Sequence, residues 1–574
     1  MKKPLLVYDG DCGFCRRWAA RWRALTGDAA AFETYQEAAA RFPQVPREAF
    51  EGAVQWFGPD GRAEGADAVF RLLALSPRHR WWLAAYRRLP GFAALSEAIY
   101  RFVAARRAAF SRLDRLLWGE SPLPPDSRAA FRLLLRLLGL VHLVAFASLW
   151  VQLDGLWGAR GILPAGELLA AARAQLGGGG WRYLPSVFWL GAADASLRAA
   201  CAAGLALSVV VMLGYAVAPA LLALWALYLS FVSVGREFMS FQWDILLLEA
   251  TLLLAWSAPW RLKPDWSRWR PPAAGVWLTR LLVFRLMLES GWVKLASGDP
   301  RWRDLTALAY HYWSQPLPPW TAWYADRLPL LAQKACCAAL FAVELGAPWL
   351  ILLPRRPRLL GFWLLVGLQT LIALTGNYGF FNPLAVVLCL SLVDGVYLPA
   401  LPERDSRAPA WSALPCSVLL LLVFWQPDAV RPFFPVNRYG LFAVMTTQRR
   451  EIVLEGSADG REWKPYEFKW KPGEVTRRPR FVEPHMPRLD WQMWFAALGT
   501  CRDNPWFVRF MVRLLQGDPA VSGLLARDPF AGGPPPRYLR STLYDYRFAP
   551  PGSDAWWTRR ALGPYCPPIS LRGQ

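Results

Sequence analysis

Long apolar runs alternate with short polar or proline-marked connections between residues 131 and 428. A bilayer core about 30 Å thick needs roughly 20 apolar residues for each helical span. The pattern therefore predicts a polytopic all-α membrane bundle with about nine transmembrane helices, flanked by two soluble ends. The expected centres of these helices are residues 143, 206, 226, 250, 286, 342, 367, 388 and 420.

The apolar run 199–234 could form one helix or two. A single helix of this length would measure about 54 Å at 1.5 Å per residue, far more than the bilayer core. Gly214 and Pro219 mark a turn near its middle. Two short spans are therefore predicted here.

The distribution of arginine predicts the orientation of the chain. The short connections 261–270 and 355–358 are basic, and eight arginines against three acidic residues lie between residues 101 and 136. Positively charged short loops stay in the cytoplasm. With nine spans the amino end is cytoplasmic and the carboxyl-terminal domain extracytoplasmic, whereas eight spans would put the 261–270 loop on the wrong side. The expected location is a bacterial inner or plasma membrane, or the endoplasmic-reticulum membrane if the source is eukaryotic.

Residues 5–15 read LLVYDGDCGFC, a short apolar strand and an Asp-Gly turn leading into a segment of helical composition. A C-x-x-C that opens a helix after a strand and tight turn is typical of a thioredoxin-like α/β domain. The helix dipole and the charges of Arg16 and Arg17 favour a thiolate at Cys12. Cys15 lies one turn further on, where it can resolve a mixed disulfide.

Two aspartates flank the turn before this motif. Asp9 and Asp11 oppose the helix dipole by raising the thiol pKa, and either could instead carry a proton. Cys12, Cys15, Asp9 and Asp11 are thus the candidate catalytic residues. The competing interpretation is a pair of structural cysteines. The sequence leaves open whether the protein is an enzyme, and if it is one, it is expected to be a thiol–disulfide oxidoreductase.

The motif YDGDCGFC (8–15) resembles the DCC family of thiol–disulfide oxidoreductase-like proteins. The resemblance continues through GRAEGADA (61–68), LPG (89–91) and YRFVAARR (100–107). It implies a small thioredoxin-like domain, residues 1–120, with disulfide reductase activity and a cytoplasmic thiol redox partner. In contrast to thioredoxin, no proline is clearly placed to face the C-x-x-C as a cis-proline.

Several charged residues fall inside predicted spans, where they are costly. They are Asp244, Glu249, Arg285, Glu289, Lys294 and Glu344. Arg285 and Glu289 are four positions apart and can pair on one helix face. Lys294 has no partner at a suitable spacing on its own helix, so Asp244 or Glu249 is the expected partner. Structural ion pairs are favoured over a catalytic role.

Two alternative functions start from the membrane part. SGWVKL (290–295), with Trp302 following, resembles the lysine-bearing segment of vitamin K-dependent carboxylase-like (HTTM) proteins, where a lysine acts as base. This implies a membrane enzyme acting on a lipid or quinone. The other alternative is a transmembrane thiol relay, for which scattered cysteines are available. They are Cys201, Cys336, Cys337, Cys389, Cys416, Cys501 and Cys566.

Beyond the last span, residues 451–470 alternate between apolar and polar positions around a Ser-Ala-Asp-Gly turn, which predicts a β-hairpin or small sandwich. Residues 489–516 return to helical composition. The chain is thus expected to comprise a proline-rich linker (121–130), a membrane domain (131–428) and a mainly-β extracytoplasmic domain with helices (429–574).

Long segments of these two domains resemble the lipase maturation factor family. They are SFQWDILLLEA (240–250), SGWVKLASGDPRW (290–302), PHMPRLDWQMWFAAL (484–498), DPFAGGPPPRYLRSTLYDYRF (528–548) and WWTRRALGPY (556–565). The resemblance implies a polytopic membrane protein whose carboxyl-terminal domain supports the folding of exported clients such as lipases. With the attached C-x-x-C domain, it suggests a bacterial fusion.

Composition narrows the remaining choices. The net charge of +22 comes from arginines spread along loops beside apolar spans, which indicates contact with a lipid bilayer and not with nucleic acid. A single C-x-x-C provides no zinc ligand set, and no metal or cofactor is expected. The leading interpretation is a membrane-bound maturation factor for exported proteins with an attached dithiol module.

Overall fold

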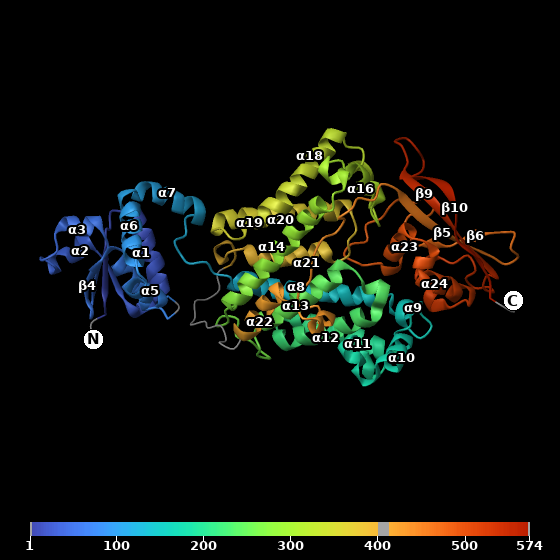
Figure 1. The fold of residues 1–574 in the computed structure, drawn as a ribbon, viewed down its shortest axis with the longest axis horizontal. Coiled ribbons are helices and arrows are strands. Elements are labelled where there is room, and N and C mark those ends of the chain that lie inside the picture. Colours follow the sequence, from blue (N-terminus) through green and yellow to red (C-terminus); the bar gives the residue numbers. More distant parts are fainter. Residues whose placement is uncertain (1–2, 78, 400–412, 572–574) are drawn as a thin grey trace. The chain divides into compact units, whose positions relative to one another are not determined.

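The computed structural model describes residues 3–77, 79–399 and 413–571 (Figure 1). The described residues form two compact units. The first contains residues 3–126 together with the short segments 353–359 and 394–399, and the second contains the rest. Residues 400–412, which precede the last predicted span, lie outside the described part of the chain.

A four-stranded mixed sheet lies at the centre of the first unit. Its order is β2-β1-β3-β4, with β1 parallel to β2 and the other neighbours antiparallel. The strands are β1 (Leu5–Tyr8), β2 (Ala31–Thr34), β3 (Gln55–Gly58) and β4 (Gly61–Glu64). The helices are α1 (Gly13–Thr26), α2 (Tyr35–Ala38), α3 (Arg47–Gly52), α4 (Gly65–Ala74), α5 (Trp81–Arg88), α6 (Phe92–Ala105) and α7 (Arg107–Trp118).

Both faces of this sheet are covered, which explains why β1 is apolar at successive positions. Leu6 packs with Trp22 of α1 and Leu72 of α4 on one face. Val7 packs with Phe50 of α3 on the other. The amino-terminal part of the chain is therefore a small α/β domain.

The segments 353–359 and 394–399 belong to this first unit because of one buried arginine. Arg355 pairs with Asp394 at 2.9 Å and donates to the carbonyl oxygens of Trp118 and Leu123. Both charged side chains are at most 1% exposed. Within the basic connection 355–358, Arg355 is buried because it holds the end of α7 and the residues that follow.

The second unit contains the helices of the membrane bundle, except that the first turn of α20 (Arg355–Thr375) belongs to the first unit. They are α8 (Arg128–Trp150), α11 (Asp194–Leu213), α12 (Val217–Gly235), α13 (Gln242–Ser257), α14 (Ala273–Ala296), α18 (Leu330–Phe341), α19 (Ala347–Leu350), α20 (Arg355–Thr375), α21 (Phe381–Cys389) and α22 (Ala413–Phe424). A π-helical turn, Ala342–Gly346, joins α18 to α19. Gly214 ends α11 in a left-handed conformation (φ +86°), so the run 199–234 forms two helices as predicted.

Five helices in the described residues are long and apolar enough to cross a membrane. They are Arg128–Trp150, Asp194–Leu213, Val217–Met239, Leu330–Leu350 and Arg355–Thr375. The prediction of about nine transmembrane helices is thus not confirmed, although a helix lies at each of the nine centres. The other four helices do not meet the length and hydropathy expected of a membrane span: α13, α21 and α22 are short, and α14 carries four charged residues.

Short helices fill the connections on either side of the spans. They are α9 (Leu153–Trp157), α10 (Ala165–Leu176), α15 (Pro300–Arg303), α16 (Leu308–Ser314) and α17 (Trp320–Ala325). The last three form the aromatic-rich connection between α14 and α18. This connection packs through Trp302 and Trp313 against Trp557 of the carboxyl-terminal part in one hydrophobic cluster.

The carboxyl-terminal part contains an antiparallel sheet in the order β10-β9-β5-β6 and a separate two-stranded pair, β7-β8. The strands are β5 (Arg449–Ser457), β6 (Lys464–Pro465), β7 (Glu467–Phe468), β8 (Leu525–Arg527), β9 (Tyr538–Phe548) and β10 (Trp557–Ile569), and the helices are α23 (Arg488–Leu498), α24 (Pro505–Leu515) and α25 (Pro519–Ser522). The β5–β6 pair confirms the predicted hairpin. The long strands β9 and β10, which were not predicted from the sequence, form most of the sheet.

Candidate functional site

Cys12 caps the amino terminus of α1, as the sequence predicts. The backbone N–H of Cys15 donates to Cys12 Sγ over 3.4 Å, so the sulfur lies at the amino end of the helix. Cys12 is partly exposed, whereas Cys15 is 8% exposed and sits one turn into the helix. The first thiol can reach a substrate disulfide and the second is positioned to attack from within.

The surroundings of the two thiols make them chemically unequal. Burial raises the pKa of the Cys15 thiol to about 12, and the hydrogen bond and charge of Cys12 add to this effect. Cys15 therefore remains a protonated thiol at neutral pH.

A glutamine that the sequence did not point to holds the turn before Cys12. Gln36 Oε1 accepts from the Gly10 N–H at 3.1 Å. Its Nε2 donates to Asp11 at 3.0 Å and to Asp9 at 3.3 Å. Both candidate aspartates therefore face one neutral amide, which fixes their position beside the motif.

The arginine near the thiols is not the one expected. Arg17, expected to support the Cys12 thiolate, pairs with Asp114 at 2.8 Å and donates to the carbonyl oxygens of Gly119 and Glu120. Arg107, from the start of α7, instead lowers the pKa of the Cys15 thiol through its charge. It lies 3.7 Å from Asp9 and is 92 positions from Cys15, too far for a local pattern to reveal.

In the second unit, Lys294 pairs with Glu344. Lys294 Nζ lies 2.7 Å from Glu344 Oε2, and each side chain is 7% exposed. The predicted partners Asp244 and Glu249 are thus wrong, because both are engaged elsewhere. Glu344 sits in the π-helical turn between α18 and α19, and such turns occur often at functional sites.

Glu249 belongs to a second cluster. Arg285 lies 3.0 Å from Glu249 and 3.2 Å from Glu289, which confirms the predicted pair along α14. Glu249 also accepts from the backbone N–H of Asn437 and from the hydroxyl of Tyr439 at 2.6 and 2.7 Å. These two donors show that the cluster holds the chain that follows α22.

Asp244 forms the third and most buried pair. Arg488 lies 2.8 Å from Asp244, the Tyr228 hydroxyl donates to the same carboxylate at 2.5 Å, and both charged side chains are 0% exposed. Arg488 begins α23 of the carboxyl-terminal part. Ser148 in α8 and Gln152, just before α9, add hydrogen bonds to the backbone at residues 486 and 488. Charges that looked isolated in the sequence therefore anchor the carboxyl-terminal part in the bundle.

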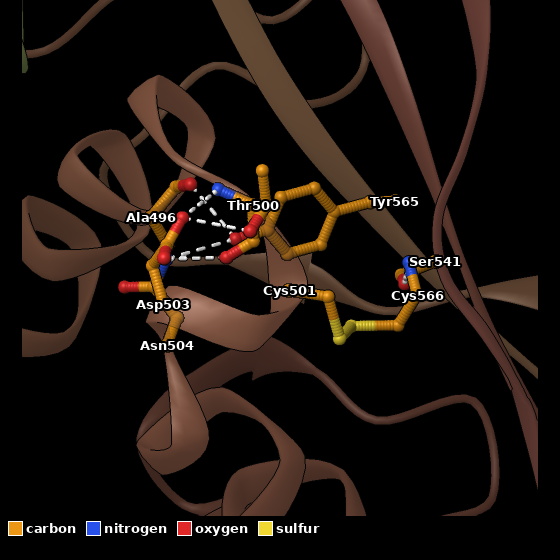
Figure 2. Close-up of a disulfide and its surroundings, with 8 residues drawn as sticks. All are labelled: Ala496, Thr500, Cys501, Asp503, Asn504, Ser541, Tyr565 and Cys566. Carbon is orange, nitrogen blue, oxygen red and sulfur yellow. Dashed lines mark hydrogen bonds between the residues drawn. A yellow bond between two sulfur atoms is a disulfide. The ribbon is translucent and has the colours of Figure 1, made fainter.

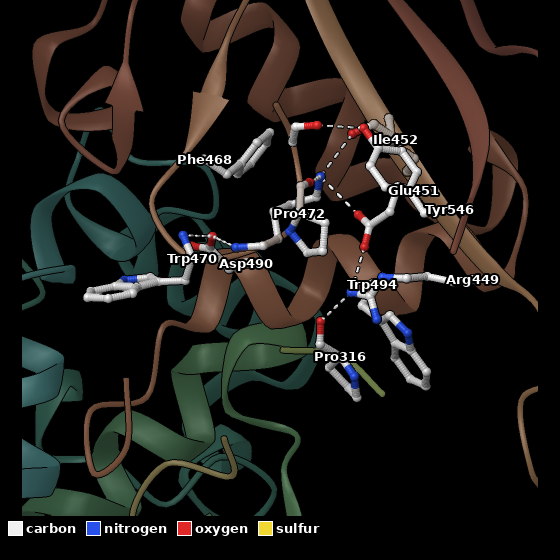
Figure 3. Close-up of polar contacts among 12 residues, drawn as sticks. Pro316, Arg449, Glu451, Ile452, Phe468, Trp470, Pro472, Asp490, Trp494 and Tyr546 are labelled. Atoms are coloured by element: carbon white, nitrogen blue, oxygen red, sulfur yellow. Dashed lines mark hydrogen bonds and ion pairs between the residues drawn. The ribbon is translucent and has the colours of Figure 1, made fainter. Parts of the chain in front are cut away.

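A fourth buried set ties the carboxyl-terminal sheet to the connection between α14 and α18 (Figure 3). On β5, Arg449 lies 2.7 Å from Glu451, whose other oxygen lies 2.9 Å from Lys471. Arg449 also donates to the carbonyl oxygens of Trp313 and Pro316. Asp490 accepts from two backbone N–H groups at residues 470 and 471. The anchoring therefore extends from the bundle into the sheet.

A disulfide joins Cys501 and Cys566, which are 65 positions apart (Figure 2). Tyr565, next to Cys566, donates to the carbonyl oxygen of Ala496 and accepts from Asn504, so β10 is fixed to the end of α23. Neither cysteine is a free thiol for the relay considered above. The remaining cysteines are free.

Replacing Cys501 and Cys566 together by serine should lower the free energy of unfolding by about 2–4 kcal/mol, since the loop they close is long. The effect is measured by unfolding the full chain in urea, with protease cleavage within residues 499–571 as the readout of unfolding. Cys336→Ser, which removes an exposed free thiol, is the matched control. Equal protease resistance in both variants would contradict the prediction.

Lys294→Met should behave as a structural lesion and lower the free energy of unfolding by about 3 kcal/mol, because it leaves Glu344 as a lone buried charge. The double variant Lys294→Met/Glu344→Gln should recover part of that loss. Folded yield after detergent extraction is the measurement. Normal yield of Lys294→Met with complete loss of function would support a catalytic lysine instead.

No group of three or more possible metal-ligating side chains is found among the described residues. Family models match the chain along most of its length. Residues 6–113 match the DCC1-like thiol-disulfide oxidoreductase, residues 129–400 the lipase maturation factor transmembrane domain, and residues 435–567 the lipase maturation factor C-terminal domain. No solved structure matches the chain.

Curated relatives agree with these matches. Lipase maturation factor 2 of Gallus gallus is 34% identical over 79% of this chain and 82% of its own length, and that of Homo sapiens is 35% identical over 78% and 83%. Lipase maturation factor 1 of Bos taurus is 36% identical over 77% and 89%. All three are animal proteins and lend no support to a bacterial source, and the matches favour this family over the carboxylase-like alternative. The chain belongs to the lipase maturation factor family and carries a DCC1-like thiol–disulfide oxidoreductase domain at its amino end.

Proposed function

We propose that the protein assists the maturation of exported proteins, lipases among them, through its extracytoplasmic carboxyl-terminal domain, and that its amino-terminal domain is a cytoplasmic dithiol module. The observation that carries this proposal is the match to lipase maturation factors over both the bundle and the carboxyl-terminal part. Three of the buried charge clusters, those around Glu249, Asp244 and Arg449, join these two parts and support a single working unit made of them.

The proposed orientation rests on the odd number of membrane crossings and on the redox state of the cysteines. An odd number of crossings, such as five, leaves the two ends of the chain on opposite sides of a membrane. If α13 and α14 cross as one further pair and α21 and α22 as another, the total is nine, and the two ends keep the same sides. The 261–270 loop then faces the cytoplasm, as its arginines require. The Cys501–Cys566 disulfide suits an oxidising compartment and the free thiols Cys12 and Cys15 a reducing one.

For the amino-terminal domain we propose a thioredoxin-like fold in which Cys12 attacks and Cys15 resolves. The strand order β2-β1-β3-β4 around a C-x-x-C at the start of α1 supports this assignment. Asp9 and Asp11 would then hold or move a proton beside the pair. Lys294, Asp244, Glu249, Arg285 and Glu289 have structural roles in this proposal.

The function is tested by expressing the chain with a secreted lipase in cells that lack their own lipase maturation factors. Secreted lipase activity per unit of lipase protein should rise several-fold, and Cys12→Ser reports whether the dithiol module contributes. An unchanged specific activity, with the factor present and folded in the membrane, would contradict a maturation role.

A further inference from the structure

A cavity of about 510 Å³ lies beside Cys15 in the first unit. Its walls come mostly from α1, α4, α5 and α6 and are mainly apolar, with the aromatic rings of Trp18, Trp22, Phe70 and Trp82 among them. This volume falls within the range of small-molecule sites, which are largely apolar and contain few polar groups. The cavity therefore has the size and character of a ligand site next to a redox-active thiol.

Three of the polar side chains at this cavity can act on a ligand. Cys15 contributes its thiol. Tyr100 Oη accepts from the Val54 N–H at 2.9 Å and keeps its own hydrogen for donation. Arg107 donates to the carbonyl oxygen of Gly52 and adds positive charge near the thiol. Tyr100 and Arg107 are thus hydrogen-bond donors suited to a carbonyl oxygen.

A polypeptide segment is a poor occupant of this cavity, because the wall has few free polar groups. Each buried peptide unit requires partners for its N–H and C=O groups. The Val54 N–H already donates to Tyr100, and the Ser96 hydroxyl donates to the carbonyl oxygen of Phe92, so neither is available to a peptide. The indole N–H of Trp18 is a further buried donor at this wall and has no hydrogen-bond partner among the described residues. The cavity instead suits a flat ligand with few polar atoms, because aromatic walls favour stacking on a ring.

The mouth of the cavity continues into an apolar stripe on α6. Leu95 and Ile99 line the cavity and are 57% and 54% exposed, and Phe102 follows one turn further on at 52%. These residues share one helix face over about 10 Å. An apolar tail leaving the cavity would lie along this stripe.

We propose that this cavity binds a lipid-soluble quinone and that the Cys12–Cys15 dithiol reduces it, an inference that rests on the dithiol activity proposed above. Two S–H bonds break and an S–S bond forms between Cys12 and Cys15. The quinone takes up the two electrons and two protons and leaves as the hydroquinone. The disulfide so formed can oxidise a substrate dithiol, which restores the starting state.

The test uses the full chain in lipid nanodiscs with decylubiquinone as the probe. The reduced protein should convert decylubiquinone to its hydroquinone, with one disulfide formed per quinone. The reaction is monitored by the loss of quinone absorbance. The double variant Cys12→Ser/Cys15→Ser should bind the probe, seen as quenched tryptophan fluorescence, without reducing it. Val103→Trp, which fills the cavity, should weaken binding and slow reduction at least tenfold, whereas Leu116→Trp, an exposed position on α7 outside the cavity wall, should do neither.

Separate measurements distinguish failure of the quinone proposal from failure of the dithiol activity and from misfolding of a variant. Protease resistance of the amino-terminal domain confirms that Val103→Trp is folded, and Ala104→Phe at the same wall replaces it if it is not. Exchange of Cys12 with hydroxyethyl disulfide but no quinone reduction would overturn the inference and leave the dithiol module standing. No exchange and no reduction would overturn both. Displacement of the probe by apolar peptides would overturn the quinone as occupant.

Discussion

Replacing Arg488 by methionine should abolish most of the folded protein, with a loss of about 5 kcal/mol in the free energy of unfolding. Arg488 is the partner of Asp244, and neither side chain is exposed. Removing the guanidinium leaves the carboxylate and the Tyr228 hydroxyl without their cation deep inside the second unit. The measurement is the monodisperse yield after detergent extraction, with thermal unfolding of what remains.

A surface arginine provides the matched control. Arg509 pairs with Glu167, but both side chains are about half exposed, so Arg509→Met should cost at most about 1 kcal/mol. Arg488→Met combined with Asp244→Asn should recover part of the lost yield. If Arg488→Met and Arg509→Met gave the same yield, the buried pair would not be an anchor.

Cys15→Ser should trap mixed disulfides through Cys12, and Cys12→Ser should lower thiol–disulfide exchange by roughly 10³-fold or more, since it removes the nucleophile. The structure supports this division of roles because Cys12 is partly exposed at the helix start and Cys15 is buried with a raised pKa. Non-reducing electrophoresis of Cys15→Ser, followed by identification of the adducts, is the measurement.

The double variant Cys12→Ser/Cys15→Ser is the control for these adducts. Adducts that persist in it would arise from another cysteine, with the exposed Cys336 as the first to check. Adducts through Cys15 in the Cys12→Ser variant would reverse the assigned roles. Extracytoplasmic partners would reverse the proposed orientation of the amino-terminal domain.

Local patterns predicted the elements that are defined by neighbouring residues. The apolar runs located the helices, Gly214 located the break between α11 and α12, and the strand–turn–helix around Cys12 folds as its sequence indicates. These features depend on period, turn chemistry and helix capping, which act over a few residues. The number of membrane crossings did not follow from the apolar pattern, because α14 carries four charges, most of whose partners lie elsewhere in the sequence: Arg285, Glu289 and Lys294 form ion pairs and Arg280 donates to the carbonyl oxygen of Ser391.

Partners far apart in the sequence could not be predicted in the same way. Glu344 is 50 positions from Lys294, and Arg488 is 244 positions from Asp244. Any acid in the bundle was an equally good candidate for Lys294 by composition. Likewise Cys501 and Cys566 have no spacing that marks them as a pair, and only the pairing of β9 with β10 brings Cys566 to its place.

The anchoring of α23 has a consequence for biogenesis. Asp244 is made 244 residues before Arg488, which is about 10–50 s of translation at 5–20 residues per second. Throughout this interval the helices around Asp244 hold a carboxylate whose cation has not yet been synthesised. The bundle therefore cannot reach its final packing while the chain is growing, and a message truncated before codon 488 would yield an unfinished membrane half exposed to quality-control proteolysis.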